Sequence, residues 1–173
     1  MTDDPAQSAP VPRRPLFWRV FGMWPDPRLL DGPTGETPAQ RLDRARASLS
    51  SDSPEKRAAG LMILGATSPA DAREPLLNAL DDPDKRVRAS VFVQSLVHHP
   101  PEAYGDRIVA KLGGESRAAE RFVSEHWPPG AIKSLGLTDR LLPHLEHISR
   151  TSARPKDRRR AAAYVRILRG QPT

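Results

Sequence analysis

The chain has 173 residues, which suits one folded domain with or without a tail, and its formal net charge is +6. Aromatic residues make up only 5%, so extensive β-sheets are not expected, and the absence of cysteine excludes disulfides, thiolate metal sites and a cysteine nucleophile. The first residues lack the positive charge of a secretory signal, and no apolar run approaches the roughly 18 residues of a membrane span. We therefore expect a cytoplasmic protein.

The positive charge is concentrated towards the C-terminus. Residues 1–114 hold fifteen basic and fifteen acidic residues, whereas residues 115–173 hold twelve basic and six acidic ones. Arginine outnumbers lysine 22 to 5. A local patch of this kind is a weaker indication of nucleic-acid binding than a uniformly basic surface.

Residues 1–37 are predicted to form a proline-rich N-terminal arm. Seven prolines in this stretch exclude long regular helices. One apolar segment, LFWRVFGMW at 16–24, interrupts the arm. Its large rings, our candidate partner-binding residues, are Phe17, Trp18, Phe21 and Trp24.

Three interpretations of the segment 16–24 remain open. It can pack on the helix expected at 38–50, or it can dock as a linear motif into a groove of a protein partner. It can also lie on a membrane surface with Arg13, Arg14 and Arg19 facing anionic lipid. The segment is too short for stable anchoring on its own, so peripheral membrane contact ranks last.

From Thr37 onwards the sequence predicts a series of short helices. Their starts carry Ser, Thr or Asp before Pro, and several ends carry Gly. Pro75 falls inside one pattern, so that helix is expected to begin or kink near Glu74, and residues 128–136 indicate a looser connection. The expected helices cover residues 37–51, 53–68, 68–82, 82–96, 99–114, 115–127, 136–150 and 154–170.

Parts of these helices recur along the chain. DSPEKR at 52–57 returns as DDPDKR at 81–86, and DRIVAKL at 106–112 returns as DRLLPHL at 139–145. A helix pair repeated about every 30 residues is the signature of an α-solenoid, in which neighbouring copies bury each other's apolar faces. We therefore predict an all-α fold over residues 38–170.

The segment 52–114 resembles the HEAT-like repeat, especially the short form found in phycobilisome-lyase-type proteins. The resemblance implies a right-handed α-solenoid of about four helix pairs, in which Asp and Arg side chains join adjacent repeats. It implies a binding surface but no chemistry. In the earlier copy, Lys56 or Arg57 takes the place of the arginine, depending on a register of 29 or 32 residues. The residues that carry the resemblance are Asp82, Pro83, Asp84, Val87, Arg88 and the apolar positions up to Leu96.

Four charged residues of this motif are predicted to be structural. Arg86 and Arg88 are expected to cap a turn or to form an ion pair between repeats with Asp82 or Asp84, and surface pairs of this kind contribute about 1 kcal/mol or less. The alternative is that they bind a partner.

The basic C-terminal segment is a candidate patch for an anionic partner, because guanidinium groups suit bidentate contacts with phosphate. The same charges can instead keep a terminal helix soluble. Tyr164 is expected to face the core rather than to stack on bases. The patch residues are Arg154, Arg158, Arg159, Arg160 and Arg166.

Metal binding and catalysis are not predicted. His144 and His147 lie one helical turn apart, but only Glu146 and His126 offer a third ligand. No Ser-His-Asp arrangement, phosphate-binding glycine loop or paired carboxylate motif is recognisable. We expect no catalytic residue, no metal, no cofactor and no small-molecule substrate.

These features predict a non-catalytic protein-binding scaffold or adaptor that uses the solenoid surface, the aromatic arm or both. The richness in Arg, Ala and Pro suggests a bacterium with a GC-rich genome. The alternative is a nucleic-acid-binding HEAT-like protein that uses the basic C-terminal helix. A role as lyase or chaperone for a tetrapyrrole rests on the name of the repeat family alone.

Overall fold

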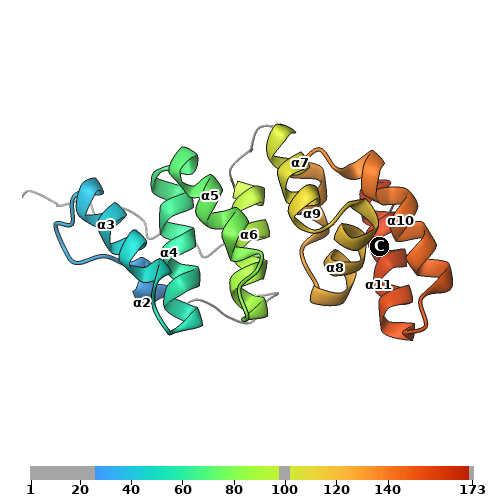
Figure 1. Cartoon of the computed structure of the whole chain (residues 1–173), viewed down its shortest axis with the longest axis horizontal. Helices are drawn as coiled ribbons and strands as arrows, with labels where there is room; N and C mark the ends of the chain where they lie inside the picture. Colours follow the sequence, from blue (N-terminus) through green and yellow to red (C-terminus); the bar gives the residue numbers. More distant parts are fainter. Residues whose placement is uncertain (1–25, 98–101, 172–173) are drawn as a thin grey trace, which may run out of the picture.

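The structure of the chain, a computed structural model, describes residues 26–97 and 102–171. Over these residues it consists of ten helices and no strand, so the all-α prediction is confirmed (Figure 1). The eight expected helices are all present, together with two short ones, α2 and α9. The bounds are α2 (Pro27–Leu30), α3 (Pro38–Leu49), α4 (Pro54–Thr67), α5 (Pro69–Ala79), α6 (Lys85–Val97), α7 (Glu102–Lys111), α8 (Glu115–Glu125), α9 (Pro129–Ser134), α10 (Thr138–Thr151) and α11 (Pro155–Leu168).

Several helices begin with the expected capping residues. Thr37 Oγ1 accepts a hydrogen bond from the Gln40 N–H at 3.3 Å, and Gln40 Oε1 accepts one from the Thr37 N–H at 2.9 Å, which forms a capping box. Ser53 Oγ accepts from the Lys56 N–H at 3.4 Å. Proline occupies the first turn of α3, α4, α5, α9 and α11, where its missing N–H costs no helical hydrogen bond.

Two local expectations were wrong. α5 begins at Pro69 and continues across Pro75 to Ala79, so a start near Glu74 is wrong, while a kink there stays a prediction. The connection expected at 128–136 contains α9, because the buried side chains of this segment hold it against the core. In both places tertiary packing overrides what local proline and glycine chemistry suggests.

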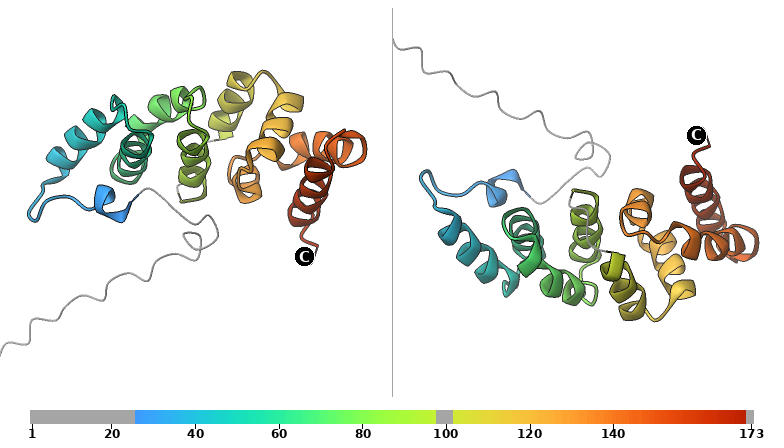
Figure 2. Two further views of the ribbon diagram at one scale, coloured as in Figure 1. Left: turned by 90° about the horizontal axis from the view of Figure 1, so that it is seen from below. Right: turned by 90° about the horizontal axis from the view of Figure 1, so that it is seen from above.

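The helices follow one another along the long axis of the molecule rather than around one centre (Figures 1 and 2). α4 lies against α3 and α5 and also against α6, and α5 lies against α7. α6 thus lies beside α4, and α7 lies beside α5. In the C-terminal half, α10 packs on α8 and α11, and α11 also contacts α8 and α9.

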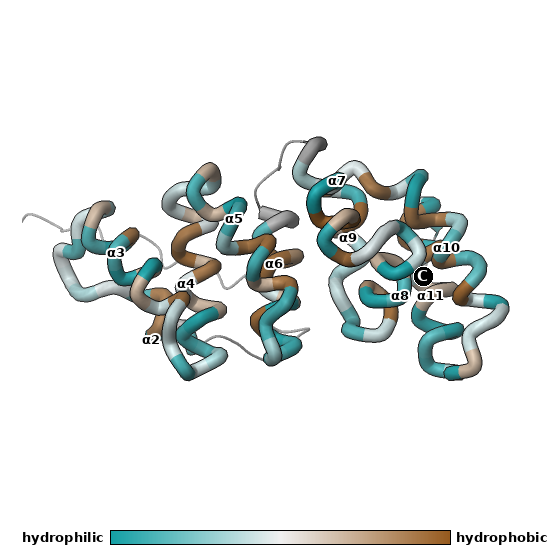
Figure 3. Tube along the Cα trace, viewed as in Figure 1, coloured by the Kyte–Doolittle hydropathy of each residue, from teal (hydrophilic) through white to brown (hydrophobic). Residues whose placement is uncertain are grey.

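α4 is enclosed by its neighbours on nearly every side. All residues from Ala58 to Gly65 are buried except Met62, and Figure 3 shows apolar residues along this helix. A Cβ at Gly60 would lie 2.8 Å from the Ala45 carbonyl oxygen of α3, and one at Gly65 would lie 2.6 Å from Gln94 Oε1 of α6. The two glycines thus let the neighbouring helices approach closely.

An aromatic cluster joins the two halves of the described chain. Phe92 of α6, Phe122 of α8 and Trp127 are fully buried. The rings of Phe92 and Trp127 stack with centroids 4.1 Å apart, and Phe122 meets them edge-on at 4.8 and 5.3 Å. Arg121 lies 5.0 Å from the centre of the Trp127 ring. Tyr164 of α11 faces this core as predicted: its hydroxyl donates to the Trp127 carbonyl at 2.7 Å, and burial raises the pKa of Tyr164 to about 12.

Replacing Phe92 with alanine is expected to lower the free energy of unfolding by about 3–5 kcal/mol, because it leaves a cavity between α6 and α8. Urea unfolding followed by far-ultraviolet circular dichroism measures the loss. Val93→Ala changes the next residue of the same helix, which is partly exposed, and should cost no more than about 1 kcal/mol. Equal losses in the two variants would contradict a joining role for the ring.

Candidate functional site

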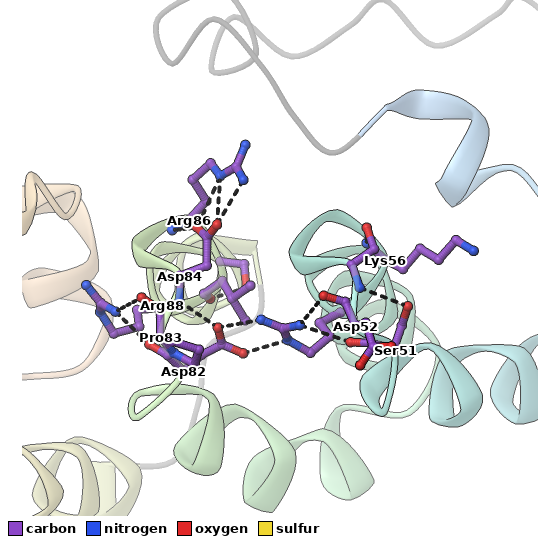
Figure 4. A network of polar contacts seen from close by, with 12 residues as sticks. Ser51, Asp52, Lys56, Asp82, Pro83, Asp84, Arg86 and Arg88 are labelled. Atoms are coloured by element: carbon purple, nitrogen blue, oxygen red, sulfur yellow. Dashed lines mark hydrogen bonds and ion pairs between the residues drawn. The ribbon is translucent and has the colours of Figure 1, made fainter.

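The predicted structural residues gather around the turn between α5 and α6 (Figure 4). Arg57 of α4 donates from Nε and Nη2 to the two carboxylate oxygens of Asp82, each at 2.8 Å. The two side chains are 17% and 11% exposed, so this bidentate pair is largely withdrawn from water. Asp82 thus joins α4 to the turn before α6.

Arg86 and Arg88 take different partners. Arg86 donates from Nη2 to Asp84 Oδ2 at 2.8 Å, within its own turn. Arg88 was expected to pair with the carboxylate of Asp82 or Asp84, but its Nε donates instead to Glu125 Oε2 at the end of α8, at 2.7 Å. The carboxylate partner differs because each of those aspartates is already bound to another arginine, whereas the expected contact with the turn is present, since Arg88 Nη1 donates to the Asp82 carbonyl. Arg86 closes a turn, and Arg88 connects α6 to α8.

Arginine is the fourth residue of α4, α6 and α11, and there its Nη1 donates to the carbonyl oxygen six residues earlier. Arg57 rather than Lys56 is therefore the counterpart of Arg88, at a separation of 31 residues. The separations of 29 and 32 residues that were inferred from similar sequence segments do not align Arg57 with Arg88. The donor and acceptor pairs are Arg57 with Ser51 at 2.9 Å, Arg88 with Asp82 at 2.6 Å, and Arg158 with Ser152 at 2.6 Å.

The aspartates of this cluster are held in their ionised form. The hydrogen bond from Arg86 lowers the pKa of Asp84 to about 2, against the opposing effect of burial. Burial alone would raise the pKa of Asp82, but the hydrogen bonds from Arg57 and from the Asp84 N–H outweigh it, so the pKa is lowered. Protonating either group weakens contacts that hold the turn.

Two of the five predicted patch residues are committed to the fold. Arg158 closes the turn before α11 through the Ser152 carbonyl. Arg160 donates from Nη1 to the Val123 carbonyl of α8 and lies 3.6 Å from Asp157 Oδ1. Both side chains are partly buried, and each guanidinium already donates to a backbone carbonyl.

The other three patch residues are available for binding. Arg154, Arg159 and Arg166 are exposed, and among the described residues their side chains have no hydrogen bond or ion pair. Arg159 and Arg166 are seven residues apart, which places them on one face of α11. The opposite face of the helix is buried through Ala161, Tyr164, Val165 and Leu168.

The structure also brings cationic residues to this patch that sequence reasoning missed. Lys85 is the first residue of α6, and His126 directly follows α8. Both are exposed, as is Lys156 of α11. Burial, and then the charges of Arg160 and Lys85, lower the pKa of His126. No pattern in the sequence connects positions 85 and 126, because only the packing of α8 between α6 and α11 brings them together.

The remaining predicted residues are placed as follows. Phe17, Trp18, Phe21 and Trp24 lie outside the described residues. His144 Nε2 lies 3.7 Å from Glu115 Oε2. In residues 26–97 and 102–171 no group of three or more His, Asp or Glu side chains is arranged to hold a metal ion.

No described helix combines the length and the apolar character needed to cross a bilayer. No protein-family model, curated protein or solved structure matches the chain. Statements about function therefore rest on the contacts and charges of its own residues.

The free energy of unfolding is expected to be level above about pH 5 and to fall between about pH 4 and pH 2. Asp84 titrates near 3.8 when unfolded and at about 2 when folded. A carboxyl with a depressed folded pKa adds stability above its unfolded pKa and loses it as the pH falls through the folded value.

Urea midpoints across this pH range test the expectation. Asp84→Asn should reduce the fall in the free energy of unfolding at acidic pH, which is the acid limb of the curve. Asp43→Asn, which changes a carboxylate that is 77% exposed, should leave the curve as in the wild type. An unchanged acid limb in Asp84→Asn would contradict the assigned role.

Proposed function

We propose that this protein is a non-catalytic binding scaffold, built as a right-handed α-solenoid of about four HEAT-like helix pairs and acting in the cytoplasm of a bacterium. The observation that carries the proposal is that α6 lies beside α4 and α7 beside α5, with Arg57 of α4 bound to Asp82 of the turn that opens α6. Arrays of this kind present long surfaces to partners rather than a single enclosed cleft.

A series of exposed ion pairs supports the same arrangement. They join α3 to α5, α5 to α7, α7 to α10, and α10 to the end of α11. Each contributes little to stability, because exposed pairs are worth about 0–1 kcal/mol. Their value here is that they show which helices are neighbours. The pairs are Arg46–Asp71, Glu74–Arg107, Asp106–Arg140 and Glu146–Arg169.

The N-terminal arm meets the helical array at α2. This helix packs on α4, Leu30 joins the core, and Arg44 Nη1 donates to the Leu29 carbonyl at 3.0 Å. The aromatic segment 16–24 ends two residues before Asp26, where the described chain begins. Buried aromatic anchors dominate the energetics of protein interfaces, so we assign the protein partner to this segment and to the helical surface near it.

Replacing Phe17, Trp18, Phe21 and Trp24 with serine should weaken capture of the partner by about tenfold or more, since one aromatic hot spot is worth about 2 kcal/mol. Tagged protein purified from native lysate after nuclease treatment, with quantitative mass spectrometry, measures the capture. Far-ultraviolet circular dichroism and the thermal midpoint should be unchanged.

The matched control is deletion of residues 1–14, which spares the aromatic segment and should keep capture intact. A longer deletion should end at Pro25, because α2, which lies within the arm, contributes to the core. A collapse of the thermal midpoint in the serine variant would show that the segment packs on its own helices. If the serine variant captures the partner as well as the wild type does, the partner binds the helical surface and not the aromatic segment.

A second candidate function is nucleic-acid binding through α11. It is favoured by the three exposed arginines that have no partner in the described part of the chain, Arg154, Arg159 and Arg166. Guanidinium groups contact phosphates through fixed pairs of N–H donors, and neutralised phosphates release counterions.

Changing these three arginines to glutamine should reduce the slope of log K against log salt for duplex DNA by about 2.7, or roughly 0.9 for each lost phosphate contact. The free energy of unfolding should stay the same. Arg158→Gln and Arg160→Gln should instead lower the free energy of unfolding by about 1–3 kcal/mol, because carbonyls of the turn before α11 and of α8 lose their charged donors.

Fluorescence anisotropy over a salt series and urea unfolding separate the two sets of variants. A salt slope that stays at its wild-type value in the triple variant would remove nucleic acid as a candidate partner of α11.

A further inference from the structure

A cationic surface continues from α11 across the end of α8 to the start of α6. Lys156 is the second residue of α11, His126 follows the last residue of α8, and Lys85 is the first residue of α6. All three are exposed. Together with Arg159 and Arg166 they place charges from three separate elements along one stretch of surface.

Two contacts fix the end of α8 between the starts of α6 and α11. Arg88 in the first turn of α6 binds Glu125 at 2.7 Å, and Arg160 in the second turn of α11 donates to the Val123 carbonyl. Both acceptors belong to the last turn of α8. His126 is therefore held beside Lys85 on one side and Lys156 on the other.

The acidic groups of this junction are already neutralised. Glu125 is shared by Arg88 at 2.7 Å and Arg121 at 2.9 Å. Asp157 lies 3.6 Å from Arg160, and its side chain is only 17% exposed. Lys85 and Lys156 have no ion pair with any described residue. The surface is thus positive and has no internal counter-ion.

The chemistry of this surface fits the backbone of duplex nucleic acid better than a folded protein. The exposed residue between Arg159 and Arg166 on the outer face of α11 is Ala162, which offers no apolar centre for a protein interface. Tyr164 is buried, so this helix offers no ring for stacking on unpaired bases. A cationic surface that has neither exposed aromatic rings nor an apolar centre contacts phosphates, and its binding is driven by the release of counterions.

We propose that Lys85, His126 and Lys156 extend the basic face of α11 into a continuous track for the backbone phosphates of duplex nucleic acid, and that protonation of His126 strengthens the binding at acidic pH. The inference rests on the nucleic-acid function proposed for α11. It adds residues from two other elements and a pH dependence.

His126 is placed to act in this way by its neighbours. Arg160, Lys156 and Asp157 face it from α11, Lys85 faces it from α6, and burial together with the cations lowers its pKa. Its protonated form is therefore disfavoured in the free protein, and a bound phosphate would replace repulsion by attraction and favour that form.

The backbone at His126 also makes a clean substitution possible. Among the described residues it is the one non-glycine residue with a positive φ, at 64°. Glycine adopts this conformation readily, so His126→Gly removes the imidazole and keeps the turn. An exposed histidine of α10, His147, serves as a matched control through His147→Ala.

The test uses the full chain and a labelled mixed-sequence DNA duplex, with anisotropy measured over a salt series at about pH 5.5 and about pH 8. For the wild type and for His147→Ala, we expect the slope of log K against log salt to be steeper by about 0.9 at the lower pH. His126→Gly should lose this difference. Lys85→Gln should reduce the slope by about 0.9 at both pH values.

The outcomes separate this inference from the function on which it rests. If the wild type binds no DNA even at low salt, both fail. If Arg159→Gln reduces the slope while Lys85→Gln and His126→Gly leave it unchanged, only the extension across α8 and α6 fails. If polyglutamate of equal charge competes as well as the duplex, the assignment to phosphate is overturned.

Discussion

The array depends on an arginine that performs two tasks at once. Arg57 closes the turn before α4 through backbone carbonyls and also binds Asp82 in the turn before α6. Arg88 repeats this arrangement: it closes the turn before α6 and binds Glu125 at the end of α8. A guanidinium can do both because it presents five N–H donors in a fixed plane, whereas an ammonium is a compact point charge. This demand agrees with a chain that contains 22 arginines and 5 lysines.

The same arrangement explains why free positive charge gathers on α11. Arg158 occupies the equivalent position there and closes its turn through the Ser152 carbonyl, but no acidic residue of a following helix binds it in the described part of the chain. Arg57 and Arg88, at the same position of earlier helices, are neutralised by Asp82 and Glu125. The outer face of α11 has no such neighbour, so Arg159 and Arg166 stay exposed. Helix order thus helps to decide which of the positive charges in residues 115–173 stay exposed.

Features that depend on neighbouring residues were predictable from the sequence, and features that depend on packing were not. The N-caps Thr37 and Ser53 stand directly before the prolines that begin their helices and were predicted correctly, whereas the part of Gln40 in the capping box was not predicted. The acceptor of Arg160 is the backbone carbonyl of Val123, which becomes a partner only after α11 packs on α8. The separation between Arg57 and its counterpart Arg88 was misassigned for a related reason. The contacts of each arginine depend on its position in the helix and not on the similarity of the surrounding sequence.

The turn after α8 connects the packing of the molecule to its candidate binding surface. Trp127 is fully buried against Phe92 and Phe122, and its carbonyl accepts a hydrogen bond from Tyr164 at 2.7 Å. Because α6, α8 and α11 all hold Trp127, the residue before it has little freedom to move relative to the starts of α6 and α11. The backbone of His126 therefore keeps its spacing from the starts of α6 and α11, so a ligand that bridges the three residues orders their side chains but not the backbone. The aromatic core sets the geometry of the surface charges without touching a ligand itself.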